Sequence, residues 1–170
     1  TEESSRVVIG GADCKKPYSA SILNISGMRY GALSEAAILA LSKAAKMGNF
    51  YHNTGEGGMS RFHLEGGGDL TWNVGTGYFG CGQGTLKRVF DPVMFKENAM
   101  RPNCAMIELK LSQGAKPAHG GMLPKAKITP AIAEARGLAF PPVGDCNSPA
   151  THSAFSTPEG MMEFIAQLRG

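Results

Sequence analysis

Short apolar runs, separated by segments with helical signals, follow one another along most of the chain. Three of these runs, residues 22–26, 50–54 and 106–111, are short and mostly apolar, which is typical of strands buried in a sheet. A shorter run, residues 7–9, lies in an otherwise polar stretch. We therefore interpret residues 1–20 as a lead-in arm with one short strand.

Signals for the start and end of helices lie between the apolar runs. Ser34 can cap a helix that runs to about Met47, with Gly48 in the left-handed position that ends it. Two later segments carry the same kind of signal: Thr129 and Pro130 open a helix that Gly137 stops, and Thr157 and Pro158 open a helix that reaches Leu168.

The stretch from residue 59 to residue 103 interrupts this alternation. It is rich in glycine and aromatic residues, and we interpret it as an excursion that ends in a short helix opened by Asp91 and Pro92. Outside it, strands alternate with helices, a pattern that predicts an α/β fold with a parallel sheet covered by helices. Residues 21–170 are therefore expected to form one domain behind the arm.

The composition narrows the class of protein. With 42% hydrophobic and 18% charged residues, the chain is typical of a soluble globular domain. It has no run of about eighteen apolar residues, so no membrane-spanning helix is expected. The net charge of +3 is spread along the chain, which argues against a basic surface for nucleic acid. No signal-peptide pattern opens the chain, although its first residue, Thr1, leaves a removed leader open.

The cysteines and histidines do not have the spacing of metal ligands. The cysteines lie far apart and include no CxxC pair; they are Cys14, Cys81, Cys104 and Cys146. Zinc and iron–sulfur sites usually have closely spaced ligands, so reduced thiols in a cytoplasmic protein are favoured. The four histidines form no HxxxH or HExxH pair, so no metal site is expected.

Many of the 23 glycines follow the apolar runs. Residues 26–28, 53–58 and 113–117 each follow a predicted strand with polar residues and glycine. Because ligand sites of β/α proteins lie outside the carboxyl ends of the strands, we expect these segments to form one ligand site. Residues 75–80 match GxGxxG, but residues 81–84 are unsuited to start a helix. A glycine-rich loop is therefore favoured over a dinucleotide site.

Four charged residues, three near these strand ends and Arg136 near a helix end, have two interpretations each. Lys110 is either an outward-facing strand residue or a cation aimed at a developing negative charge, such as that of a reduced flavin ring. Lys116 is either solvated or a partner for a carboxylate or phosphate. Glu56, between glycines, lies in a solvated turn or in the site. Arg136 either complements a helix dipole or binds a carboxylate through two donors.

Several of these segments together resemble the FMN-binding synthase domain of glutamate synthases, in its archaeal-type and large-subunit forms. Residues 24–34, NISGMRYGALS, are similar to the family's NISAMSFGALS segment. Residues 51–58 resemble the family's second strand and its glycine loop, and residues 110–124 resemble the third strand and the loop after it. The likeness continues through residues 148–168, so it covers nearly all of residues 20–169.

This resemblance implies the N-terminal part of a (β/α)8 TIM barrel, about three strands of it, which binds FMN at its carboxyl-terminal face. It implies an oxidoreductase of glutamate biosynthesis, which reduces 2-iminoglutarate, formed from 2-oxoglutarate and ammonia, to L-glutamate. The ammonia would come directly or from glutamine. Electrons would come from NADPH or ferredoxin, through another chain or domain and an iron–sulfur cluster. The four cysteines do not match the family's cluster ligands.

The resemblance also implies roles for individual residues. The flavin site would include Ser26, Gly27, Met28, Lys110 and Gln113. The 2-oxoglutarate site would include Glu56, Lys116, Arg136 and Met122, with Glu56 and Lys116 also assigned to catalysis. Met122 stands where the family has Gln, which leaves the identity of the substrate open. Gly27 and Arg29 stand where the family usually has Ala and Ser.

The length of the chain also departs from the family's barrel. A (β/α)8 barrel takes about 200 residues or more, and three parallel strands would leave an open sheet edge. We therefore expect this stretch to be inactive alone and to be completed by other segments, a partner chain or further copies. The alternative is a non-catalytic half-barrel that acts as a binding or assembly module and needs a partner chain.

Overall fold

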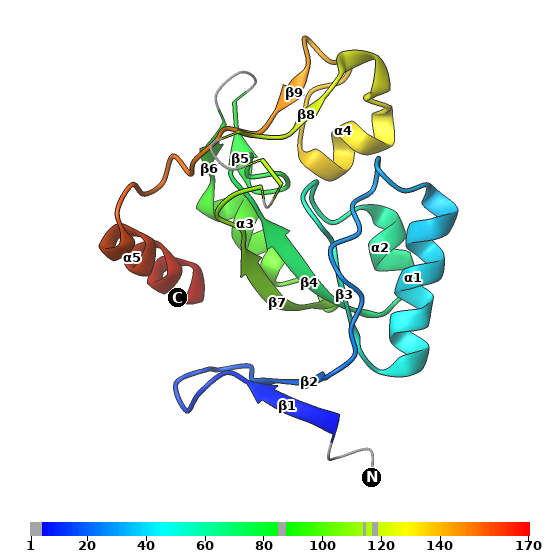
Figure 1. Ribbon diagram of the computed structural model, residues 1–170, viewed down its shortest axis with the longest axis vertical. Helices are drawn as coiled ribbons and strands as arrows, with labels where there is room; N and C mark the ends of the chain where they lie inside the picture. Colours follow the sequence, from blue (N-terminus) through cyan, green and yellow to red (C-terminus); the bar gives the residue numbers. More distant parts are fainter. Residues whose placement is uncertain (1–4, 85–87, 114, 117–118) are drawn as a thin grey trace.

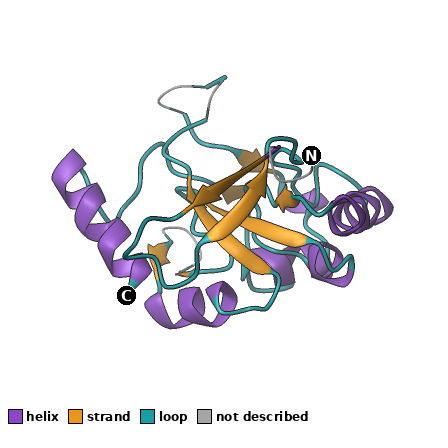
Figure 2. Ribbon diagram, turned by 90° about the horizontal axis from the view of Figure 1, so that it is seen from below, coloured by secondary structure: helices purple, strands orange, loops and turns teal. Residues whose placement is uncertain are grey.

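A parallel three-stranded sheet forms the centre of the chain. A computed structural model describes residues 5–84, 88–113, 115–116 and 119–170. The strands lie in the order β3 (Tyr51–Asn53), β4 (Asp69–Val74) and β7 (Cys104–Leu109) (Figure 1). Helices lie to the sides of the strands and below them in Figure 2. The structure is thus a mixed α/β fold with a parallel sheet, in agreement with the predicted fold class.

The central strand of this sheet lies where the sequence suggested an excursion. β4 pairs with β3 on one side and with β7 on the other, and Leu70 through Val74 are buried. Its Trp72 is fully buried and stacks on Phe95 of α3 (Pro92–Ala99), with ring centroids 5.5 Å apart. The interpretation of residues 59–103 as an excursion was therefore wrong, because polar Thr71 and Asn73 hid the strand among apolar residues.

The predicted buried strand at residues 22–26 was also wrong. Ile22 and Leu23 are exposed, and their backbone turns out of the preceding strand, since Leu23 N donates to Ser21 Oγ at 3.2 Å. Only Ile25 pairs with the sheet, through an isolated parallel bridge to His52 of β3. Beyond this bridge, the backbone N–H of Met28 donates to the Asn53 carbonyl at 3.1 Å, so the segment contacts the edge of β3 without forming a strand there.

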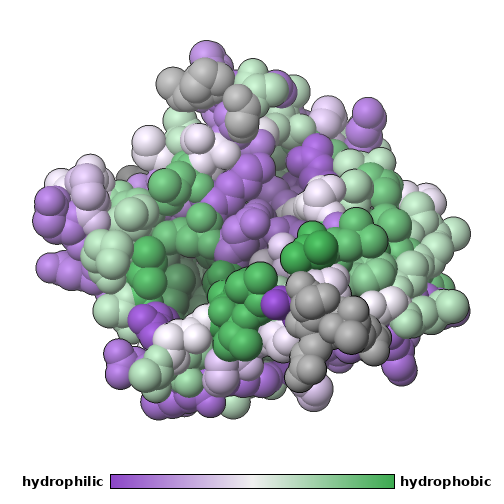
Figure 3. Space-filling model, turned by 60° about the horizontal axis from the view of Figure 1, so that its bottom comes forward, coloured by the Kyte–Doolittle hydropathy of each residue, from purple (hydrophilic) through white to green (hydrophobic). Residues whose placement is uncertain are grey.

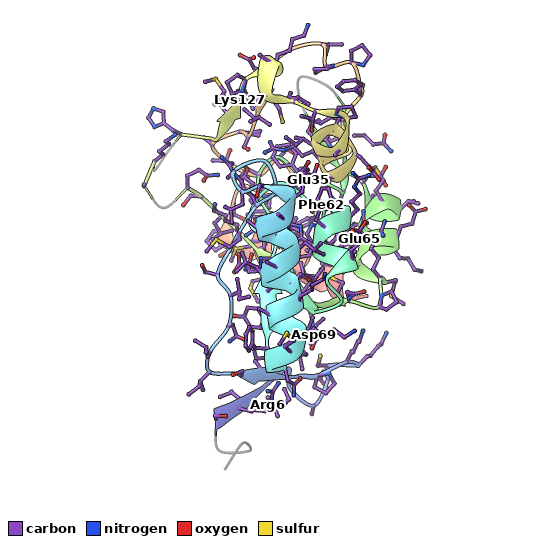
Figure 4. All side chains as sticks on the ribbon, turned by 90° about the vertical axis from the view of Figure 1, so that its right-hand side faces the viewer. Arg6, Glu35, Phe62, Glu65, Asp69 and Lys127 are labelled. Carbon is purple, nitrogen blue, oxygen red and sulfur yellow. The ribbon has the colours of Figure 1, made fainter. Side chains whose placement is uncertain are left out.

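Two helices cover the β3 side of the sheet, α1 (Glu35–Gly48) and α2 (Arg61–Glu65), which lie side by side (Figure 4). Ser34 caps α1 as predicted, but the left-handed residue at its end is Asn49, with φ 53°, rather than Gly48. Gly48 lies inside the helix because the ring of Phe50 packs there. A Cβ on Gly48 would lie 1.9 Å from that ring. The glycine therefore makes room for a ring, whereas Asn tolerates the left-handed backbone.

The remaining helices follow the predicted signals more closely, whereas the small sheets beside them were not predicted. α3 begins after Asp91, α4 (Pro130–Arg136) after Thr129 and α5 (Pro158–Arg169) after Thr157, and each of these side chains accepts a backbone N–H of its helix. Two short antiparallel pairs and one 3-10 turn complete this part: β5 (Gly82–Gln83) with β6 (Val89–Phe90), β8 (Met122–Leu123) with β9 (Cys146–Asn147), and η2 (Lys125–Lys127).

The lead-in arm forms a hairpin below the sheet. Its two strands are β1 (Arg6–Ile9) and β2 (Tyr18–Ser21), where the sequence predicted one. Tyr18 Oη donates to Asp69 Oδ2 at 2.9 Å, and Arg6 Nη1 donates to the carbonyl of Asn49 at 2.8 Å. Most of β1 is apolar yet exposed, and Figure 3, which brings this lower end forward, shows apolar surface there.

Candidate functional site

A cleft of about 390 Å³ lies at the carboxyl ends of the parallel strands. Its walls come from four segments: residues 27–33, the loop after β3, the end of β4, and β7 with the loop that follows it. The loops that were predicted to form one ligand site therefore meet around one space. β4 contributes to it as well, which the sequence interpretation had not included.

Glu56 lies at the centre of a polar cluster in this cleft, which we call the Glu56 cluster: Glu56, Lys110, Gln113 and Ser148. Glu56 is 6% exposed, so the solvated-turn interpretation was wrong. One carboxylate oxygen accepts a hydrogen bond from the Ser148 hydroxyl, and the other accepts one from the Gln113 amide. Lys110 Nζ lies 3.8 Å from Glu56 and donates to Gln113 Oε1 at 3.2 Å. A buried carboxylate needs such partners to remain charged.

A second set of polar side chains lies on the same face of the sheet. Glu108 of β7 accepts hydrogen bonds from Asn73 of β4 and from Asn53 of β3, the latter at 2.9 Å. One carboxylate therefore connects three adjacent strands. Asn73 Oδ1 is buried and has no hydrogen-bond partner among the described residues. Since Asn73 lines the cleft, this acceptor lies next to the space where a ligand could donate to it.

The sequence contained a signal for Glu108 that the strand prediction did not use. Residues 106, 108 and 110 alternate along β7, so their side chains lie on one face of the sheet. Polar residues at two of these positions, Glu108 and Lys110, indicate a face directed at a polar site rather than at an apolar core. Ser148 had no comparable local signal, because it lies 92 residues from its partner Glu56.

Two glycines form a narrow wall of the cleft. Gly27 and Gly55 pack backbone to backbone, and a Cβ on Gly27 would lie 3.3 Å from Gly55 Cα. Gly55 has φ 62°, and a Cβ there would lie 2.9 Å from the backbone nitrogen of Arg29. Larger residues would push these segments apart. Beside them, Ser26 is exposed and Met28 is half-buried.

The loop that carries Met28 is fixed by a buried histidine from α2. His63 Nε2 lies 3.0 Å from the Met28 carbonyl, while its Nδ1 accepts from the backbone N–H of Ser60 at 3.1 Å. This pair of partners assigns the proton to Nε2. Burial lowers the pKa of His63 to about 4, although its bond to the Met28 carbonyl opposes the change. The ring is therefore neutral at neutral pH.

Arg136 is buried at the end of α4 rather than exposed in the cleft. It is 3% exposed, and its guanidinium carbon lies 4.7 Å from the centre of the Phe79 ring. Nη1 lies 3.4 Å from the sulfur of Cys146, whereas Nε and Nη2 have no partner among the described residues. Nη2 lies next to Gly57, the neighbour of Glu56. Two unpaired donors of a buried cation mark a place where an anion could bind.

Two further predicted site residues are exposed. Lys116 is exposed in the loop after β7, where its backbone N–H donates to the Gln113 carbonyl at 3.1 Å. Met122 is 62% exposed on β8. Neither residue lines the described cleft. The prediction for residues 113–117 also includes Gly114 and Pro117, which lie outside the described residues.

Metal and membrane features were searched in the part of the chain that the structure describes. This part contains no group of three or more His, Cys, Asp or Glu side chains that could hold a metal ion. It also contains no helix that is both long and apolar enough to span a bilayer. The four cysteines are free, and burial raises the pKa of the Cys81 thiol to about 12 and that of Cys104 to about 11.

Comparison with known protein families shows which family this chain belongs to. The model of a family described as "Conserved region in glutamate synthase" matches residues 2–170, which is nearly the whole chain. The chain belongs to the glutamate synthase family. The resemblance seen in the glycine-rich strand ends is thereby confirmed, and the lead-in arm is included in the matched region.

Individual relatives agree with this assignment. The chain is 38% identical over 164 residues to the "Glutamate synthase large subunit-like protein YerD" of Bacillus subtilis (strain 168), a match that covers 95% of the chain and 30% of the relative. It is 34% identical over 145 residues to the "Archaeal-type glutamate synthase (NADPH)" of Thermotoga maritima and 33% identical to the "Archaeal glutamate synthase (NADPH)" of Methanocaldococcus jannaschii. Each of these two matches covers 85% of the chain and 25% of the relative. The chain thus spans less than a third of the length of these glutamate synthase relatives.

Proposed function

We propose that this chain is part of an FMN-dependent glutamate synthase-like oxidoreductase. The observation that carries the proposal is the Glu56 cluster, which brings a buried carboxylate and a lysine together at the carboxyl ends of parallel strands. Ligand sites of β/α enzymes lie at this end of the sheet. The sheet with its helices would be the first part of a TIM barrel, and further segments would complete it.

The residues of the cleft fit the ring of a flavin. The ring system is flat and suits the narrow wall made by Gly27 and Gly55. It offers one N–H, which suits the unpaired Asn73 Oδ1 and the carboxylate of Glu108. Its carbonyl oxygens and the charge of its reduced form suit the amine of Lys110. When bound, FMN would supply the hydride that reduces 2-iminoglutarate to L-glutamate.

The Glu56 cluster would order this side of the site. Both oxygens of Glu56 accept hydrogen bonds, so its carboxylate holds the Gln113 and Ser148 side chains in place. Gln113 in turn positions Lys110, because Gln113 Oε1 accepts a hydrogen bond from the Lys110 amine. Such fixed donors cost little reorganisation when charge develops on a ligand, which is how positioned groups stabilise a transition state.

Arg136 and Lys116 would bind the two carboxylates of 2-oxoglutarate. Two donors of Arg136, Nε and Nη2, have no partner among the described residues, and a carboxylate accepts two parallel N–H bonds from a guanidinium. Lys116 is exposed and would approach its carboxylate from the loop after β7. Met122 would face the substrate from β8, and Glu56 would take part in catalysis. Ammonia or glutamine, and electrons from NADPH or ferredoxin, would reach the site through other domains or chains.

The experiment is an assay of the complete enzyme with 2-oxoglutarate, ammonium and a chemical reductant, in which glutamate is measured by mass spectrometry. Replacing Lys116 by Met removes one carboxylate partner and should raise the apparent KM for 2-oxoglutarate about tenfold, which corresponds to about 1.4 kcal/mol. Lys127→Met is the matched control, because Lys127 is exposed on η2 and lies outside the cleft (Figure 4).

Two results would contradict the proposal at different levels. If the complete wild-type enzyme forms no glutamate, the reaction is wrong. If Lys116→Met and Lys127→Met leave the KM equally unchanged, the substrate role of Lys116 is wrong while the reaction stands.

The second candidate function is a non-catalytic half-barrel that assembles with a partner chain. Two observations favour it: among the described strands, β7 pairs on one side only, and β1 exposes apolar side chains, with Val7 59% and Val8 66% exposed. Open strand edges and exposed apolar patches are typical of contact surfaces. A monomeric mass of the purified chain would count against pairing between two copies.

A further inference from the structure

The loop between β9 and α5 returns to the strand ends, where Ser148 contacts Glu56 and His152 contacts Lys110. Ser148 N donates to the Gly121 carbonyl at 2.8 Å, and Thr76 Oγ1 donates to the Pro149 carbonyl at 2.6 Å. Further along the loop, His152 is buried next to Lys110. This histidine has no part in the proposed function so far.

His152 makes two hydrogen bonds that fix a proton on Nε2. Nε2 lies 2.8 Å from the carbonyl oxygen of Lys110, and Nδ1 lies 3.0 Å from Tyr78 Oη. A carbonyl can only accept, so Nε2 must carry a proton. Tyr78 Oη already accepts the N–H of Ala154 at 3.2 Å, so the tyrosine can give its own proton to Nδ1. The neutral Nε2–H tautomer satisfies every one of these partners.

The surroundings of His152 favour this neutral form and hold the ring still. Burial lowers its pKa, against the opposing effects of the Lys110 carbonyl and of Glu56. The ring stacks on Phe155, with centroids 4.8 Å apart and planes at 20°. Tyr78, its hydrogen-bond partner, is fully buried and has φ 45°, in the glycine-rich loop after β4. A rigid donor therefore points at the backbone of Lys110.

We propose that His152 is a positioning residue for Lys110. By holding the Lys110 carbonyl where β7 ends, it fixes the backbone from which the lysine side chain reaches Gln113 and Glu56. Tyr78 orients the histidine. The value of this arrangement for flavin binding rests on the proposed function, but the arrangement itself is a property of the chain's own residues.

The test measures the reactivity of the Lys110 amine without any flavin. The protein is labelled with a limiting amount of an acetylating reagent, and Lys110 and Lys43 are compared by mass spectrometry. Lys43 is exposed on α1 and serves as internal standard. Two variants remove the same ring, but each can keep a different one of its two hydrogen bonds. His152→Gln places an amide N–H where Nε2 was, whereas His152→Asn places it nearer to Nδ1.

We expect Lys110 labelling relative to Lys43 to stay within about twofold of wild type in His152→Gln. In His152→Asn it should rise severalfold, because the freed strand end releases the amine from its partners. A merely structural role of the ring would move both variants alike, so equal labelling in the two would overturn the proposal.

A third variant covers the case in which His152→Asn does not fold, as judged by far-UV circular dichroism. Tyr78→Phe removes only the O–H that orients His152, and it should raise Lys110 labelling by a smaller factor. Unchanged labelling in Tyr78→Phe would contradict the proposal. Because no flavin is present, a failure here leaves the proposed function standing, and a failure of FMN binding leaves this result standing.

Discussion

The Glu56 cluster and the His52–His63 pair are two buried polar regions that differ in how their polar atoms are satisfied. In the Glu56 cluster a carboxylate is buried with a hydrogen-bond donor at each oxygen and a lysine nearby. His52 lies with its ring centroid 5.1 Å from that of His63, and neither nitrogen of His52 has a partner among the described residues. The first region surrounds a carboxylate with hydrogen-bond partners, whereas the histidines of the second are buried as neutral rings.

This difference distinguishes buried polar side chains that fill the core from those that lie beside a cleft and could act on a ligand. Burial, and then the charge of His63, lower the pKa of His52 to about 4, so the pair can fill the core between β3 and the helices as neutral rings. A charged side chain in the same place would be costly. The Glu56 cluster carries that cost at the carboxyl ends of the strands and next to a cleft, where fixed charges can act on a ligand.

The largest effect that would test this comparison is the pH dependence of stability. Unfolded histidines protonate near pH 6.5, but His52 and His63 in the fold protonate only near pH 4. The unfolded state therefore binds more protons between these values. The free energy of unfolding should fall as the pH drops from 6.5 to 4, by up to about 1.4 kcal/mol per pH unit for each histidine. Urea unfolding at pH 7, 6 and 5 measures it.

Two leucine variants sharpen this prediction. His52→Leu leaves no described partner unsatisfied, so at pH 7 it should leave the free energy of unfolding unchanged or raise it. It should also make the free energy of unfolding depend less on pH. His63→Leu leaves the Ser60 N–H and the Met28 carbonyl without their histidine partner. It should lower the free energy of unfolding by about 1–3 kcal/mol. If His52→Leu destabilises as much as His63→Leu and the pH slope persists, the assignment of His52 as an unpaired neutral ring is wrong.

A smaller effect is expected from Glu108, which lines the cleft and connects three strands. Glu108→Gln presents an amide N–H₂ to one of two asparagine donors, so one hydrogen bond should be lost. We expect the free energy of unfolding to fall by about 1–2 kcal/mol. Glu134→Gln on α4 is the control, since Glu134 is exposed and should change stability by less than about 0.5 kcal/mol. Equal stability of the two variants would show that the Glu108 contacts contribute nothing.

The starts of α1, α3, α4 and α5 could be predicted because their signals are local, whereas the short helix α2 was missed. Thr129 and Thr157 each precede a proline and cap a helix where expected. The sheet was harder, because pairing joins residues far apart. β4 alternates polar residues, of which Asn73 lines the cleft, with buried apolar residues, so it lacked the continuous apolar pattern of a buried strand. Conversely, the apolar pair Ile22 and Leu23 is exposed, because their segment leaves the sheet.

The candidate site was predictable only in part, for a similar reason. The glycine-rich strand ends indicated where the cleft lies, and Glu56, Lys110 and Gln113 do meet there. Ser148 and His152 reach the cluster from a loop that passes back over the strands, and no local pattern indicates such a return. The roles of Lys116, Arg136 and Met122 in binding 2-oxoglutarate came from the family resemblance, and they stay predictions.

The most direct test of the central claim, that this cleft holds FMN, is a spectroscopic titration of the complete protein with the flavin. We expect bound flavin at close to one molecule per protein, with a shifted visible absorption band. Lys110→Met should weaken binding about tenfold, whereas Lys43→Met, which changes an exposed lysine on α1, should not. No bound flavin, or equal affinity of both variants, would contradict the claim.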